Sequence, residues 1–179
     1  MKKNFENLQV TRSYFMRIIA LTLMVALFSL PVKMNAQGSN PNFSGSWAFN
    51  ESKSNLGEGG NFRRASQMAV TQTGNNLSVD RVRNNQNGET TTTTEKFTLD
   101  GKESVNDSGR GPSKAIVTWS ADGKALNFAI TRTFDRNGET TVMKSSEVWT
   151  LTDASTLSVL STFVMQDQER KTTLVYDKK

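Results

Sequence analysis

The chain has 179 residues, 22 of them basic and 17 acidic, and it contains neither cysteine nor histidine. This composition rules out disulfides, thiolate or imidazole metal sites, and the Ser-His-Asp and Cys-His catalytic arrangements. Any catalysis would have to use carboxylates, lysine, tyrosine or serine, so we expect no enzyme, no bound metal and no cofactor.

The first 36 residues have the pattern of an export signal. A basic stretch precedes the apolar run 18–30, and the small residue Ala36 stands before a polar one. The run has 13 residues, whereas a transmembrane helix needs about 20. We therefore expect cleavage after Ala36 and a periplasmic or secreted domain, 37–179, with no stable membrane span. An uncleaved membrane anchor is the alternative.

Cleavage would change the net charge of the chain. Five basic residues and one acidic residue lie in 1–36, so 17 basic and 16 acidic residues remain. The positive excess belongs mostly to the signal, and we expect no nucleic-acid partner. The oligomeric state is not predicted by the sequence.

The first strand is predicted at 43–50. Phe43, Gly45, Trp47 and Phe49 alternate along it, and they share one face because successive side chains of a strand point to opposite sides. Trp47 is large enough to close one end of a small barrel. The polar, glycine-rich stretch 51–65 that follows is predicted to be a long loop, either functional or simply mobile.

Short strands separated by turns fill the rest of the chain, so the fold class is all-β. Such spacing favours an antiparallel meander, and the meander would close into a single up-and-down barrel. A two-sheet sandwich is the alternative. With the first strand included, nine strands are predicted: 43–50, 66–72, 76–84, 89–99, 114–120, 124–134, 139–151, 156–165 and 169–177.

The turn at 135–138 sets a register for the hairpin around it. A three-residue loop there places Arg132 opposite Val142 and leaves Trp149 and Glu147 on the other face, unless a bulge intervenes. A buried cation such as Arg132 needs a partner. That partner would be either a ligand carboxylate or phosphate, or a carboxylate of the chain itself, Glu147 or Glu95. Alternatively, the Arg132 side chain would extend to the rim of the barrel and reach water.

The same turn geometry at 85–88 places Arg81 opposite Thr93. Arg81 and Glu95 then become diagonal neighbours on one face, close enough for an ion pair. This pair would be either structural or a polar anchor inside a cavity. Together with apolar residues of the same faces, these arginines give the predicted ligand-binding set: Arg81, Phe97, Trp119, Phe128 and Arg132.

Gly45-Ser46-Trp47 on a first strand resembles the lipocalin signature, and more loosely that of the fatty-acid-binding proteins. Asn50 to Ser54 and the ending Tyr176 to Lys179 resemble small exported bacterial lipocalin-like domains. The resemblance implies a barrel with 51–65 as a flap over its open end. It also implies that Trp47 packs on a cation, for which Arg170 and Lys171 are the candidates.

A lipocalin-like fold implies binding of a small apolar or amphipathic molecule inside the barrel. The Arg-x-Tyr of many fatty-acid-binding proteins is replaced near the end by Leu174-Val175-Tyr176, which does not support that mode of carboxylate binding. A structural or protein-interaction module whose barrel is filled by its own side chains is the alternative.

Overall fold

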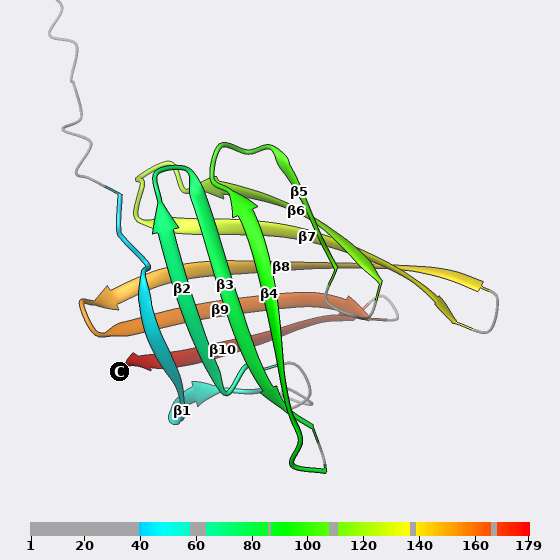
Figure 1. The fold of residues 1–179 in the computed structure, drawn as a ribbon, viewed down its shortest axis with the longest axis horizontal. Coiled ribbons are helices and arrows are strands. Elements are labelled where there is room, and N and C mark those ends of the chain that lie inside the picture. Colours follow the sequence, from blue (N-terminus) through cyan, green and yellow to red (C-terminus); the bar gives the residue numbers. More distant parts are fainter. Residues whose placement is uncertain (1–39, 58–63, 86, 108–110, 137–138, 166–167) are drawn as a thin grey trace, which may run out of the picture. The chain divides into compact units, whose positions relative to one another are not determined.

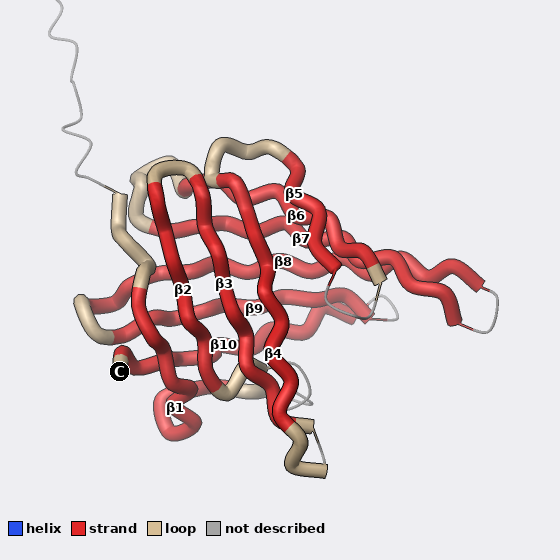
Figure 2. Tube along the Cα trace, viewed as in Figure 1, coloured by secondary structure: helices blue, strands red, loops and turns tan. Residues whose placement is uncertain are grey.

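Ten antiparallel strands and the turns between them make up the described part of the chain (Figures 1 and 2). The computed structural model describes residues 40–57, 64–85, 87–107, 111–136, 139–165 and 168–179. The predicted signal, 1–36, lies outside these residues. None of the described segments is a helix that is long and apolar enough to cross a membrane. The strands are β1 (Gly45–Asn55), β2 (Gln67–Thr73), β3 (Asn76–Asn84), β4 (Thr90–Thr98), β5 (Glu103–Asp107), β6 (Pro112–Trp119), β7 (Ala125–Arg136), β8 (Glu139–Asp153), β9 (Thr156–Met165) and β10 (Gln168–Lys178).

All ten strands belong to one up-and-down sheet in the order β4-β3-β2-β1-β10-β9-β8-β7-β6-β5. Except for β4 and β5, each strand pairs with its neighbour in sequence, and β1 also pairs with β10, which brings the first and last strands together in the middle of the sheet. The sheet curls into a nearly closed barrel with β4 and β5 at its facing edges (Figure 1). The all-β barrel prediction is confirmed, and the two-sheet sandwich is wrong.

The edges are joined by side chains. The side-chain amide of Asn106 on β5 accepts from the Lys96 amide at 2.7 Å and donates to the Lys96 carbonyl at 3.0 Å. Next to it, Ser104 Oγ accepts from the Thr98 amide at 3.0 Å. These bonds replace backbone pairing at the seam between β4 and β5.

Two parts of the strand prediction differ from the structure. Strand β5 was not predicted, because its sequence Glu-Ser-Val-Asn-Asp has one apolar residue and that residue, Val105, faces outward. Strand β1 continues to Asn55 with a shift in register, so 51–55 is strand rather than the beginning of the predicted loop.

The β3–β4 register is as predicted, with Arg81 opposite Thr93. The β7–β8 register is wrong by one residue. Arg132 lies opposite Met143, and the ladder ends at Arg136 and Glu139, so two residues rather than three separate the strands. Because side chains alternate, this slip moves all of β8 to the opposite face. Trp149 therefore points inward and is fully buried, without the bulge that the predicted register required.

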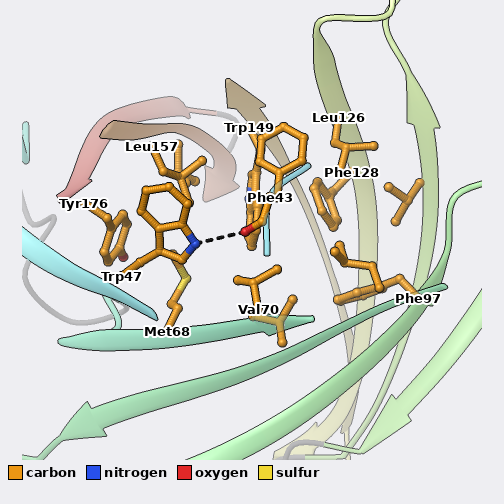
Figure 3. Packing of buried hydrophobic residues seen from close by; sticks show 14 of the residues in the cluster. Phe43, Trp47, Met68, Val70, Phe97, Leu126, Phe128, Trp149, Leu157 and Tyr176 are labelled. Carbon is orange, nitrogen blue, oxygen red and sulfur yellow. Dashed lines mark hydrogen bonds between the residues drawn. The ribbon is translucent and has the colours of Figure 1, made fainter. Parts of the chain in front are cut away.

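Large aromatic residues pack the interior around the amino-terminal segment (Figure 3). Phe43, Trp47, Phe128 and Trp149 are each at most 1% exposed. The Trp47 indole donates from Nε1 to the Phe43 carbonyl at 3.0 Å. This bond ties the segment that precedes β1 to the core and closes this end of the barrel.

Candidate functional site

The inner surface of the barrel changes from apolar to polar side chains along seven of its strands. On β3 the inward residue Val79 is followed by Arg81, and on β8 the inward Trp149 is preceded by Glu147. Five more strands make the same change, between the pairs Phe97 and Glu95, Ala115 and Ser113, Ile130 and Arg132, Val159 and Ser161, and Leu174 and Thr172. We call the half of the barrel interior near residues 40–44, the segment that precedes β1, the apolar half. The other half of the interior is called the polar half.

Some of the strand pairings bring these changes side by side. Ser113 lies opposite Arg132, and Ser161 lies opposite both Glu147 and Thr172. Between β7 and β8 the changes are offset, since Glu147 lies opposite Phe128 and Arg132 lies opposite Met143. Arg132, Glu147 and Ser161 are partly covered, whereas Arg81, Glu95, Ser113 and Thr172 are buried. The polar half is therefore the candidate site.

An ion-pair cluster lies at the boundary between the two halves. Arg81 donates from Nε to Glu95 and from Nη2 to Glu147, both at 2.8 Å, and its Nη1 lies 3.7 Å from the sulfur of Met68. Glu147 also accepts from the Trp149 indole at 2.8 Å. The guanidinium lies 5.3 Å from the Trp149 ring centroid, within cation–π range.

Burial and charge act against each other in this cluster. Burial disfavours the charged form of Glu147, but attraction to Arg81 and the hydrogen bonds from Trp149 and Arg81 are stronger, so its pKa is lowered. For Arg81, burial would lower the pKa, but Glu147 and Glu95 outweigh it and the pKa is raised. Arg81 and Glu147 are therefore both charged at neutral pH.

Two more arginines lie beyond the cluster. Arg83 donates from Nη1 to the Thr93 hydroxyl at 2.9 Å. Burial, with repulsion from Arg81 and Arg132, lowers its pKa despite the two glutamates. Arg132 has a buried Nε with no hydrogen-bond partner among the described residues. Arg83 is therefore close enough to Arg132 and to the cluster to interact with their charges, and both carboxylates of the cluster bond Arg81.

The predicted ligand residues fall into different environments. Phe97 and Phe128 are buried in the apolar half with ring centroids 5.4 Å apart, and Phe128 is 5.0 Å from Trp149. Trp119 is half-buried, 6.1 Å from Phe43. These three aromatics contact the core rather than the polar half. Their role as ligand residues, like that of Arg81 and Arg132, stays a prediction.

The expected cation for Trp47 is a different residue. Lys178, which is opposite Trp47 in the β1–β10 ladder, has its ammonium 5.4 Å from the ring. The choice of Arg170 or Lys171 was wrong because these residues lie near the start of β10, and antiparallel pairing brings its end to Trp47. Gly45 makes room for Lys178, since a Cβ at Gly45 would lie 2.7 Å from Lys178 Cε.

Sequence reasoning missed Glu147 as the partner of Arg81, and it missed Trp149 and Arg83. Glu147 and Trp149 could have been found from the requirement that a large aromatic residue such as Trp149 be buried. That requirement favours the observed β7–β8 register, which turns both residues inward. The choice of Glu95 or Glu147 as a partner for Arg132 was also wrong, because both glutamates bond Arg81. Among the described residues, no group of acidic side chains has the arrangement of a metal site.

Two hollows lie beside the barrel edges. One hollow, of about 320 Å³, lies where β4 ends and β5 begins, and its lining includes Leu77, Phe97 and Ser104. The other, of about 360 Å³, lies between Pro112 and Phe134 at the opposite end. Neither includes the cluster around Arg81 in its lining.

No protein-family model and no curated protein matches the chain in sequence. Among solved structures, the zebrafish ileal bile acid-binding protein, crystallised with cholic acid, is similar in fold. Its TM-score is 0.50 and its sequence identity is 17%, over 76% of this chain and 98% of that chain. At this identity the likeness concerns the fold alone, which is calycin-like.

Proposed function

We propose that this protein binds a small apolar or amphipathic molecule in the polar half of the barrel and catalyses no reaction on it. The observation that carries the proposal is the change from apolar to polar lining on seven strands. A barrel that only needs a core would continue its apolar lining, because burying polar groups without partners costs free energy. Arg81, Glu95, Glu147 and Ser113 have partners within the chain. The buried Nε of Arg132 has none among the described residues, and a ligand or water would supply one.

Arg132 is the residue that we assign to contact with the ligand. Its Nε is buried without a partner among the described residues, and a guanidinium can bind a planar anion through two parallel hydrogen bonds. Arg81 has carboxylates on Nε and Nη2, so we assign it to the structure of the site. Cholic acid, which the zebrafish protein holds in its crystal, is an amphipathic molecule of the proposed kind.

Native mass spectrometry tests this proposal. The protein is purified from the cells that make it and measured under native and then denaturing conditions. We expect a discrete additional mass that is lost on unfolding. Apo protein that also shows no change in tryptophan fluorescence with fatty acids, bile acids or isoprenoids would contradict the proposal.

A side-chain-filled structural or interaction module remains the second candidate. The observation in its favour is the apolar half, where Phe43, Phe97, Phe128 and Trp149 pack against one another. This packing fills that half without a ligand. The module predicts that no small molecule changes the thermal stability of the protein.

We also propose that residues 1–36 direct export and are removed after Ala36. The support is the sequence pattern of a basic stretch, a short apolar run and a small residue. Fractionation of expressing cells with intact-mass measurement tests this. We expect a chain starting at Gln37 outside the cytoplasm, and a full-length chain retained in the membrane fraction would contradict it.

A further inference from the structure

We propose that the ligand is a compact anion, bound with its charged head against Arg132 and Arg83 and its apolar part directed away from the apolar half. This inference rests on the proposed function and specifies the class of ligand. Three features of the barrel interior carry it: the excess of positive charge, the closed floor of the polar half, and its limited depth.

The first feature is charge. Arg83 interacts electrostatically with Arg81, Arg132, Glu95 and Glu147, and Arg81 interacts with both glutamates. Both glutamates already bond Arg81 at 2.8 Å, so they do not neutralise Arg132. An anionic head group beside the free Nε of Arg132 would supply the missing negative charge. A neutral ligand would leave that charge excess in place.

The second feature is the floor. The Arg81–Glu95–Glu147 cluster spans β3, β4 and β8 at the boundary, and directly behind it lie Phe128 and Trp149, which are at most 1% exposed. An alkyl chain could enter the apolar half only by breaking these ion pairs and displacing the rings. The polar half is therefore closed at its inner end.

The third feature is depth. Beyond Arg132, β7 continues for four residues to Arg136, or roughly 13 Å of strand at about 3.3 Å per residue. Partly buried apolar side chains of this half, including Phe134, Met143 and Phe163, can cover the apolar part of a ligand over that distance. A longer chain would leave the barrel and reach water.

Isothermal titration of the full protein with hexanoate, decanoate and hexadecanoate below their micelle concentrations tests the depth. Each buried CH₂ raises affinity about fourfold. We expect a rise from hexanoate to decanoate of more than tenfold and a change of less than about threefold from decanoate to hexadecanoate. A further rise of a hundredfold would overturn the inference, because the tail would then occupy the apolar half.

The head group is tested with decanol and decyl phosphate, and with Arg132→Met. We expect decanol and the variant each to lose at least tenfold in affinity relative to decanoate on the unchanged protein. Tighter binding of decanoate or of decyl phosphate identifies which anion the site prefers. Lys144→Met is the matched control, since Lys144 is an exposed cation on the outer face of β8, and it should bind decanoate as before.

The outcomes separate this inference from the proposed function. Equal binding of decanol and decanoate would overturn the anion and leave a ligand-binding barrel. No binding by any of these probes would contradict both. The chain-length series and the comparison with decanol use the unchanged protein, so they remain decisive if Arg132→Met fails to fold.

Discussion

At the scale of the residue, Arg81 shows how a charge is kept inside a barrel. Its side chain is 7% exposed, and it is bonded to one glutamate from the adjacent strand and to another from across the barrel. The bond to Glu95 followed from the sequence because a short turn fixes the register of β3 and β4. The bond to Glu147 could not be predicted, because it joins residues that are 66 positions apart in the sequence. It also depends on which face of β8 points into the barrel.

Replacing Glu147 by glutamine should destabilise the protein by about 3 kcal/mol, because it removes one partner of a buried ion pair. Urea unfolding measures the change. Glu103→Gln is the matched control, because Glu103 pairs with Lys114 on the surface and such a pair contributes less than about 1 kcal/mol. Equal effects of the two variants would contradict the role given to the cluster.

The lowered pKa of Glu147 predicts a loss of stability in acid. Since the folded protein holds a proton on this group less tightly than the unfolded chain does, the contribution is complete above the ordinary value of 4.5 and disappears as pH falls through the lower folded value. The unfolding free energy should fall below about pH 4.5, and less steeply in Glu147→Gln. Exposed carboxylates with lowered pKa, such as Asp177, contribute equally to both proteins. Parallel pH profiles would contradict this assignment.

Gly45 is the other residue with a testable structural role. Its φ is +150°, a conformation open almost only to glycine, and a side chain there would also meet Lys178. Gly45→Ala should cost roughly 1–3 kcal/mol and change the fluorescence of the tryptophans by moving Lys178 from Trp47. Lys178→Met, which removes the cation but keeps the glycine, should change the fluorescence with a smaller loss of stability. An unchanged unfolding midpoint in Gly45→Ala would contradict the expectation that a side chain at this position strains the backbone.

At the scale of the element, the seam between β4 and β5 depends on side chains that mimic a strand. Asn106 makes two bonds to the backbone of Lys96, and it is 8% exposed. The sequence did not indicate this role, because an asparagine in a short polar segment is typical of a turn. Only the closing of the barrel brings β5 to the edge of β4.

Asn106→Ala should therefore destabilise the barrel by about 1–3 kcal/mol, since it leaves buried backbone groups unsatisfied. Hydrogen exchange of the Lys96 amide should speed up in the same variant. Lys96→Thr keeps both backbone groups and changes only an exposed side chain, so its stability should change by less than about 0.5 kcal/mol. Slow exchange at Lys96 in Asn106→Ala would show that the seam is held in another way.

The hairpin of β7 and β8 shows the limit of predicting a register from turn chemistry. The predicted loop began at Arg136, but Arg136 is the last residue of β7 and pairs with Glu139. The loop therefore has two residues instead of three, which reverses every side chain of β8. The burial of Trp149 was the better guide. A strand with one large aromatic residue is more safely oriented by that residue than by its turn.

At the scale of the whole molecule, the meander of turns and alternating apolar residues was enough to predict the barrel. It was not enough to predict that its interior has an apolar and a polar half. That division is visible only when seven strands are compared in the register of the sheet, since each strand contributes only a single step from an apolar to a polar inward residue. Two members of the predicted site, Arg81 and Arg132, lie at or beyond the boundary. The other three lie in the apolar half, because aromatic residues in a strand mark a core as readily as a binding surface.

The most direct test of the account is the ¹⁵N NMR signal of the Arg132 Nε–H group, assigned with Arg132→Lys, during titration with decanoate. We expect this signal to shift and saturate with the affinity that calorimetry gives, while the Nε–H signal of Arg81, held by Glu95, stays in place. Binding that leaves Arg132 unchanged, or that shifts Arg81 instead, would contradict a ligand in the polar half.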